Sequence, residues 1–103
     1  MAQKYALEYI PLFEKDLESA RDYITNTLQN PAAAMRLIED TDKAILKRLK
    51  NPLAFEPHRS AKKRKHPYYR IDIRNFAVFY VVIGNVMEVR RFVYSKRDLS
   101  KII

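Results

Sequence analysis

The hydrophobic pattern at the start of the chain changes from the period of a strand to the period of a helix. Tyr5, Leu7 and Tyr9 alternate with polar or small residues, which predicts a short, half-buried strand. Pro11 ends that strand. Beyond it, apolar residues recur every three or four positions, as on the buried side of an amphipathic helix: Phe13, Leu17, Ala20, Ile24 and Leu28.

A second helix is predicted to begin at Asn30-Pro31, because asparagine caps helix N-termini and proline is favoured at the first helical position. Asn51-Pro52 ends this helix. The short connection predicts that the two helices pack as an antiparallel hairpin. The apolar side of the second helix consists of Ala34, Leu37, Ile38, Thr41, Ile45 and Leu49.

The second half of the chain begins with a predicted loop over 52–67, which holds three prolines and a run of four cations. Three strands are predicted after it. The first has alternating charged residues, the second is continuously apolar and rich in β-branched residues, and the third follows a Gly-Asn turn. Their ranges are 69–74, 76–83 and 86–94.

These elements predict a single α+β domain over 1–103: an N-terminal strand, an α-hairpin and a three-stranded antiparallel meander, in the order β-α-α-β-β-β. The meander must be antiparallel, because its connections are too short for crossovers. The helical hairpin covers one sheet face. We expect the other face, carrying Arg70 and Arg74, to be at least partly open. The pattern leaves open where the first strand joins and whether 98–103 is helical or extended.

Composition narrows the function further. The chain has 103 residues and no cysteine, which excludes disulfides, thiolate nucleophiles and thiolate metal sites. Two histidines, His58 and His66, cannot build a zinc site alone, so no metal or cofactor is expected. There is no apolar run long enough to span a membrane and no signal-peptide pattern at the start, so a soluble cytoplasmic protein is expected.

The net charge of +8 is unevenly distributed. Residues 1–50 hold eight basic and eight acidic residues, whereas residues 51–103 hold twelve basic and four acidic ones. This asymmetry indicates an anionic partner, either a nucleic acid or an acidic protein segment. A membrane surface fits less well, because no basic amphipathic helix accompanies the charge.

Four segments, taken together and in this order, resemble the RelE/ParE superfamily of type II toxin–antitoxin toxins. Each segment alone is weakly specific, but together they cover nearly the whole chain. They are Asn30-Pro31-Ala32-Ala33-Ala34, Tyr69-Arg70, Asn75-Phe76-Ala77-Val78-Phe79-Tyr80 and the run Val89-Arg90-Arg91-Phe92-Val93-Tyr94-Ser95-Lys96-Arg97-Asp98.

The resemblance implies a compact toxin that a cognate antitoxin neutralises by wrapping an acidic, partly disordered segment around its basic surface. Some branches of the superfamily cleave messenger RNA on the ribosome, and others inhibit DNA gyrase without catalysis. The location of the positive charge favours a ribosome-dependent mRNA endoribonuclease. The alternative is a ParE-like gyrase inhibitor.

Metal-free RNA cleavage uses the substrate's own 2′-hydroxyl as nucleophile, so the protein supplies acid–base groups and cations that stabilise the phosphorane. Arg70 is the first candidate, because its fork matches paired phosphate oxygens and the resemblance places a functional arginine on this strand. The alternative is a solvated arginine, or one paired with Asp72 or Glu88.

Other cations supply further candidates. Mutual repulsion in the run 62–65 lowers lysine pKa and could free Lys65 as a base, although electrostatic binding alone is the simpler interpretation. Arg97 lies where the superfamily places phosphate contacts, but it could instead pair with Asp98. The expected nucleic-acid contacts are Lys62, Lys63, Arg64, Arg74, Arg90, Arg91 and Lys96.

The remaining catalytic candidates are His66 and Tyr94. Neighbouring positive charge would keep His66 neutral, as a general base requires, although His66-Pro67 also suits a loop-to-strand junction. Tyr94 could stack a base or transfer a proton, or simply pack in the core. The chain ends Ser100-Lys101-Ile102-Ile103, without the aromatic or histidine that the superfamily's nucleases often place there. This departure favours the gyrase inhibitor.

Overall fold

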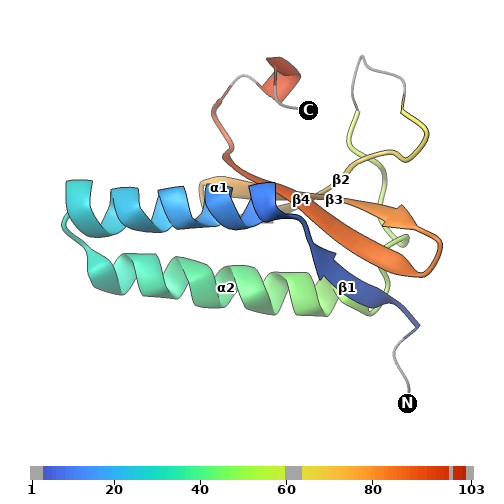
Figure 1. The fold of residues 1–103 in the computed structure, drawn as a ribbon, viewed down its shortest axis with the longest axis horizontal. Coiled ribbons are helices and arrows are strands. Elements are labelled where there is room, and N and C mark those ends of the chain that lie inside the picture. Colours follow the sequence, from blue (N-terminus) through green and yellow to red (C-terminus); the bar gives the residue numbers. More distant parts are fainter. Residues whose placement is uncertain (1–3, 60–63, 98, 102–103) are drawn as a thin grey trace.

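The structure is a computed structural model that describes residues 4–59, 64–97 and 99–101. It confirms the predicted α+β class and the order of strands and helices (Figure 1). A π-helical segment, η1, continues the first helix, and a 3₁₀ turn, η2, lies near the C-terminus. The elements are β1 (Ala6–Tyr9), α1 (Pro11–Asp22), η1 (Tyr23–Thr27), α2 (Pro31–Leu49), β2 (Tyr69–Ile73), β3 (Phe76–Ile83), β4 (Val86–Tyr94) and η2 (Leu99–Lys101).

The four strands form one sheet in the order β1-β4-β3-β2. Strands β2, β3 and β4 are the predicted antiparallel meander. Strand β1 pairs in parallel with the first half of β4, from Ala6 opposite Val86 to Tyr9 opposite Val89. Among the described residues, no strand lies beside the second half of β4 on that edge.

Residues 29–31 set the turn between the two helices and the start of α2. Asn30 caps α2, with its side-chain oxygen accepting from the Ala33 amide at 3.1 Å, and Pro31 takes the first helical position. Gln29 adopts a φ of 51°, which lets the chain reverse between the helices. The predicted buried stripe of the first helix is wrong at Leu28, which caps η1 and is 56% exposed. Within the described residues no helix is long and apolar enough to cross a membrane.

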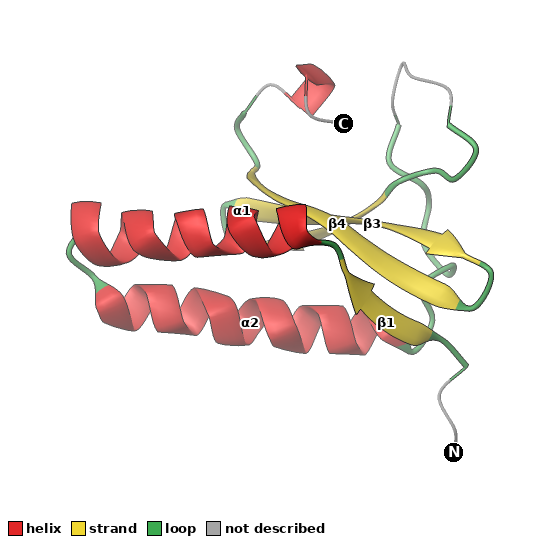
Figure 2. Ribbon diagram, in the orientation of Figure 1, coloured by secondary structure: helices red, strands yellow, loops and turns green. Residues whose placement is uncertain are grey.

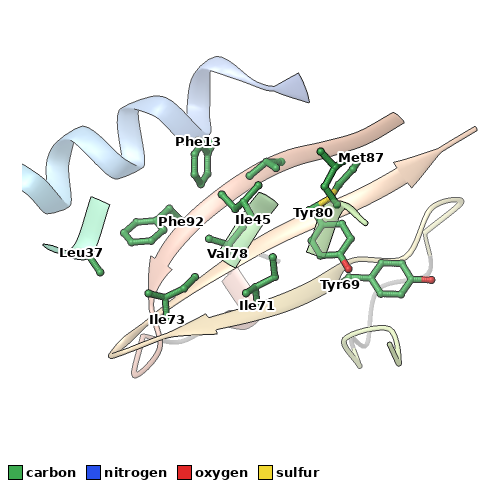
Figure 3. Packing of buried hydrophobic residues seen from close by; sticks show 12 residues of the cluster. Phe13, Leu37, Ile45, Tyr69, Ile71, Ile73, Val78, Tyr80, Met87 and Phe92 are labelled. Atoms are coloured by element: carbon green, nitrogen blue, oxygen red, sulfur yellow. The ribbon is translucent and has the colours of Figure 1, made fainter. Parts of the chain in front are cut away.

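The main core lies between the helical hairpin and one face of the sheet (Figure 3). Phe13 from α1 meets Phe92 from β4 edge to face, with ring centroids 6.1 Å apart. Ile45 of α2 is fully buried against the strands. Each methylene buried in this way contributes roughly 0.8 kcal/mol, so this interface dominates the stability of the fold.

The opposite face, called here the second face, is covered rather than open. Phe79 and Val81 of β3 are fully buried there, and Val93 of β4 is 3% exposed. The cover comes from the loop before β2, which brings His58 and Tyr68 onto Phe79, and from Leu99 of η2. Figure 2 shows the loop before β2 and the short helix η2 on the side of the sheet away from α1 and α2. The expectation of a partly open second face is therefore wrong for its centre.

Beyond the end of β1, a carboxylate accepts a hydrogen bond from the backbone edge of β4, as a neighbouring strand would. Asp16 of α1 accepts a hydrogen bond from the Phe92 amide at 3.0 Å and pairs with Arg91 at 2.7 Å. Both side chains are mostly buried, at 15% and 20% exposed. Asp16 thus satisfies the edge of β4 and neutralises a strand arginine at the same time.

We expect Asp16→Ala to reduce the free energy of unfolding by about 2–3 kcal/mol, because it leaves the Phe92 amide and the Arg91 charge without their partner. Lys15→Ala, an exposed neighbour on the same helix, should change it by less than about 0.5 kcal/mol. Urea denaturation of both variants measures the difference. Equal stability of the two variants would show that Asp16 is not a structural anchor.

Candidate functional site

The second face gathers cations around two aromatic rings. Arg70 of β2 lies opposite Phe79 of β3 in the antiparallel register, and its guanidinium is 5.8 Å from the centre of that ring. His58 contacts the same ring edge to face, with centroids 5.0 Å apart. The His58 amide also donates to the Tyr68 carbonyl at 2.7 Å, which fixes the loop against the start of β2.

Tyr68 is the second ring, and two arginines lie over it. The guanidinium of Arg64 is 4.5 Å from the ring centre and that of Arg90 is 6.0 Å from it. We call Arg64, Arg70, Arg90, His58, Tyr68 and Phe79 the aromatic–cationic cluster. Protein surfaces that bind nucleic acids commonly combine aromatic rings, on which bases stack, with guanidinium groups.

Carboxylates compensate two of the arginines of this cluster. Arg70 pairs with Asp72 at 2.7 Å, and Arg90 pairs with Glu88 at 3.2 Å. Burial opposes the charge of Arg90, but the hydrogen bond with Tyr68 and the Glu88 carboxylate outweigh it and raise the pKa of Arg90. The structure thus confirms the alternative prediction for Arg70, in which its guanidinium pairs with Asp72. An anion approaching Arg70 has to compete with Asp72.

Two other predicted nucleic-acid contacts are tied to the helices instead. Arg74 was expected on the strand face beside Arg70, but β2 ends at Ile73 and Arg74 lies in the following turn, with a φ of 55°. From there it pairs with Asp40 of α2 at 2.7 Å. Arg91 follows a β-bulge in β4 and is held by Asp16 of α1. Neither arginine belongs to the cluster.

Tyr94 and Arg97 lie in a different place, an apolar groove of about 640 Å³ at the turn of the helical hairpin. Tyr94 contacts Phe76 edge to face, at 5.7 Å between centroids, and both face the helices. Arg97 is the only charged residue of the described lining. The groove is lined by Ala20, Tyr23, Ile24, Leu28, Asn30, Ala33, Asn75, Phe76, Tyr94 and Arg97.

The sheet therefore separates the candidate catalytic residues into two groups. Arg70 lies on the second face against Phe79, whereas Tyr94 and Arg97 line the groove on the helix side. General acid–base catalysis needs its groups within hydrogen-bond reach of one substrate atom, or one water away. A strand layer between Arg70 and Tyr94 prevents these two from acting on the same phosphate.

The remaining candidates are solvent-facing or undescribed. Lys65 and Lys96 are exposed, and His66 is half-buried in the segment that leads into β2. Lys62 and Lys63 lie outside the described residues. Among the residues that are described, no three His, Asp or Glu side chains converge as they would at a metal site.

Sequence reasoning missed two residues that shape this surface. His58 lies in a proline-rich loop, and nothing in its neighbourhood indicates that the loop folds back onto Phe79. Arg48 of α2 donates to the Arg70 carbonyl at 3.2 Å and to the Tyr80 hydroxyl at 3.0 Å. Its guanidinium also stacks 3.6 Å from the centre of Phe55. Arg48 thereby positions β2 and the loop relative to each other.

Comparisons with known proteins identify a family from the sequence and similar folds among solved structures. A family model described as the ParE toxin of the type II toxin–antitoxin system parDE matches residues 7–99. A solved structure of the chromosomal ParDE toxin–antitoxin system from P. aeruginosa is similar in fold, with a TM-score of 0.70 and 16% identity, over 92% of this chain and 100% of that one. The RelB-RelE antitoxin–toxin complex from Methanococcus jannaschii also matches, with a TM-score of 0.49 and 20% identity, over 86% and 91% of the two chains. No match was found among curated proteins.

The stability of the fold should depend on the protonation of His58. Burial lowers the pKa of His58 and the charge of Arg70 lowers it further, which Asp72 partly offsets. The folded protein therefore favours neutral His58, so its contribution is complete above the unfolded value of about 6.5 and is lost as the pH falls through the lowered pKa.

Urea midpoints between pH 7.5 and pH 5 test this dependence. Wild type should lose stability relative to His58→Gln as the pH falls, because glutamine does not titrate. Parallel pH profiles for the two proteins would show that His58 does not couple to folding.

Proposed function

Since this chain belongs to the ParE toxin family of type II toxin–antitoxin systems, we propose that it inhibits DNA gyrase by binding, without catalysing a reaction of its own. The single observation that carries the proposal is the separation of Arg70 from Tyr94 and Arg97 by the sheet. An inhibitor that acts by binding needs a surface complementary to its target and no converging acid–base groups. The separation of Arg70 from Tyr94 and Arg97 is therefore compatible with inhibition by binding.

A ribosome-dependent endoribonuclease remains the second candidate, and the aromatic–cationic cluster favours it. Its rings and guanidinium groups offer stacking and charge to a single strand of RNA. In this hypothesis Arg70 stabilises the phosphorane, with Lys65 or His66 as the base. Against it stands the compensation of Arg70 by Asp72 and of Arg90 by Glu88.

Tyr94→Phe tests whether the hydroxyl of Tyr94 takes part in catalysis, since it keeps the ring in the groove and removes only the hydroxyl. An endoribonuclease that uses Arg70 with Lys65 or His66 does not need this hydroxyl, so the integrity of messenger RNA decides between the two functions. We expect this variant to inhibit the supercoiling of relaxed plasmid by purified gyrase within about twofold of wild type, and to arrest growth equally well. A catalytic Tyr94 would instead lose about 10²–10⁴-fold in activity.

Messenger ends and plasmid supercoiling should be examined in the same induced culture. Inhibited supercoiling with intact messenger supports the proposal. Gyrase that is indifferent to the purified protein, together with cleaved messenger, would replace it with the endoribonuclease.

We also propose that a cognate antitoxin neutralises this toxin, and that an acidic, partly disordered segment of it folds into the groove. The groove offers apolar walls from Ile24, Ala33 and Phe76, with Arg97 as the cation that an acidic segment would meet. Folding on binding would bury these walls and pair the charge. Affinity should then fall with salt, because part of the attraction is long-range.

Ala33→Glu tests the groove, with Ala32→Glu as its matched control. Both positions are in the first turn of α2, where a carboxylate suits the helix dipole, but only Ala33 lines the groove. We expect Ala33→Glu to weaken antitoxin binding at least about tenfold, whereas Ala32→Glu should stay near wild type. Equal affinities by calorimetry would remove the groove from the antitoxin interface.

A further inference from the structure

The outward side of α2, together with Lys50 just after its end, carries a row of four cations. Arg36, Lys43, Lys47 and Lys50 are all exposed, and their spacings of seven, four and three residues keep them on one side of the helix. With a rise of about 1.5 Å per residue the row extends for roughly 21 Å. We call these four residues the α2 cation row.

Charge pairing elsewhere in the fold leaves this row positive. The first half of the chain is neutral in sequence, but Asp16 and Asp40 are committed to Arg91 and Arg74 from the second half. Helix carboxylates thus neutralise two arginines of the second half and are no longer available to the helix cations. The remaining carboxylate on this side of α2 is exposed Glu39, between the first two cations of the row, so the four cations still outnumber it. In the part of the chain that the structure describes, no carboxylate forms an ion pair with any member of the α2 cation row.

We propose that the α2 cation row binds the phosphate backbone of duplex DNA. One DNA strand carries a phosphate per 3.4 Å of helix axis, so a row of roughly 21 Å runs past about six phosphates. Lysine binds phosphate as a point charge and reads no base, so the contact is independent of sequence and sensitive to salt. This goes beyond the proposed function, since it concerns DNA itself and needs no gyrase.

The composition of the row favours DNA over an acidic protein or a membrane. Lysine is depleted at protein interfaces, which need apolar or aromatic anchors. The exposed apolar residues of α2, Met35 and Leu46, are eleven positions apart and form no continuous anchor. A membrane-bound helix would have to insert its apolar side, but that side of α2 is buried against the sheet.

Fluorescence anisotropy with a labelled 20-base-pair duplex tests the proposal on the purified full chain. The triple variant Lys43→Gln, Lys47→Gln, Lys50→Gln should bind at least about tenfold more weakly than wild type at 50 mM salt. Its slope of log affinity against log salt should fall by about 2–3, since each lost phosphate contact removes roughly 0.9.

The matched control is Lys4→Gln, Lys15→Gln, Arg21→Gln, which makes the same change in net charge on exposed residues outside the row. It should keep most of the affinity and the wild-type slope. Circular dichroism and urea midpoints show whether the row variant is folded, because Lys47 lies in the last turn of α2 and Lys50 just after it, where cations also favour the helix dipole. If row and control variants bind alike, only overall charge matters and the proposal is wrong.

Two competitors decide the class of partner. Polyglutamate or anionic phospholipid vesicles that displace the duplex as effectively, at equal charge, would overturn the assignment to DNA. Gyrase inhibition is measured separately, so the two proposals fail independently. Row-dependent duplex binding with indifferent gyrase rejects only the inhibitor, and inhibited gyrase with no row-dependent duplex binding rejects only this inference.

Discussion

Strand β3 has no face that water can reach along most of its length, and this requirement organises the rest of the molecule. Residues 77–81 are fully buried, with Val78 and Tyr80 turned to the helices and Phe79 and Val81 turned away from them. The helical hairpin can cover only one side of such a strand. The loop before β2 and the 3₁₀ turn near the C-terminus cover the other, so these connecting segments are structural parts of the sheet.

The buried sheet also determines which side chains can act together. Arg70 and the rings of Tyr68 and Phe79 share the second face, while Tyr94 and Arg97 share the groove with the turn of the hairpin. No rotamer change carries a side chain through a packed strand layer. The aromatic–cationic cluster and the groove are therefore separate surfaces, and a partner on one of them leaves the other accessible.

Local chemistry made most of the fold predictable. The Asn30-Pro31 cap, the continuously apolar strand and the Gly-Asn turn each act over a few residues, and the structure confirms all three. The edge at which β1 joins the sheet is set by packing between distant segments, which no local pattern encodes. For the same reason, the sequence could not predict that the loop before β2 folds back onto Phe79 and brings His58 against that ring.

The charged site was harder to predict because small backbone irregularities redirect side chains. The bulge opposite Phe79 and Tyr80 breaks the alternation of β4 at Arg90, and β2 ends one residue before Arg74. Each shift brings an arginine within reach of a helix carboxylate, Asp16 in one case and Asp40 in the other. Counting charges in each half of the sequence places the positive surface on the strands. In the folded protein, helix carboxylates neutralise two of the second-half arginines, Arg74 and Arg91, and the α2 cation row forms a further positive surface on the outer side of α2.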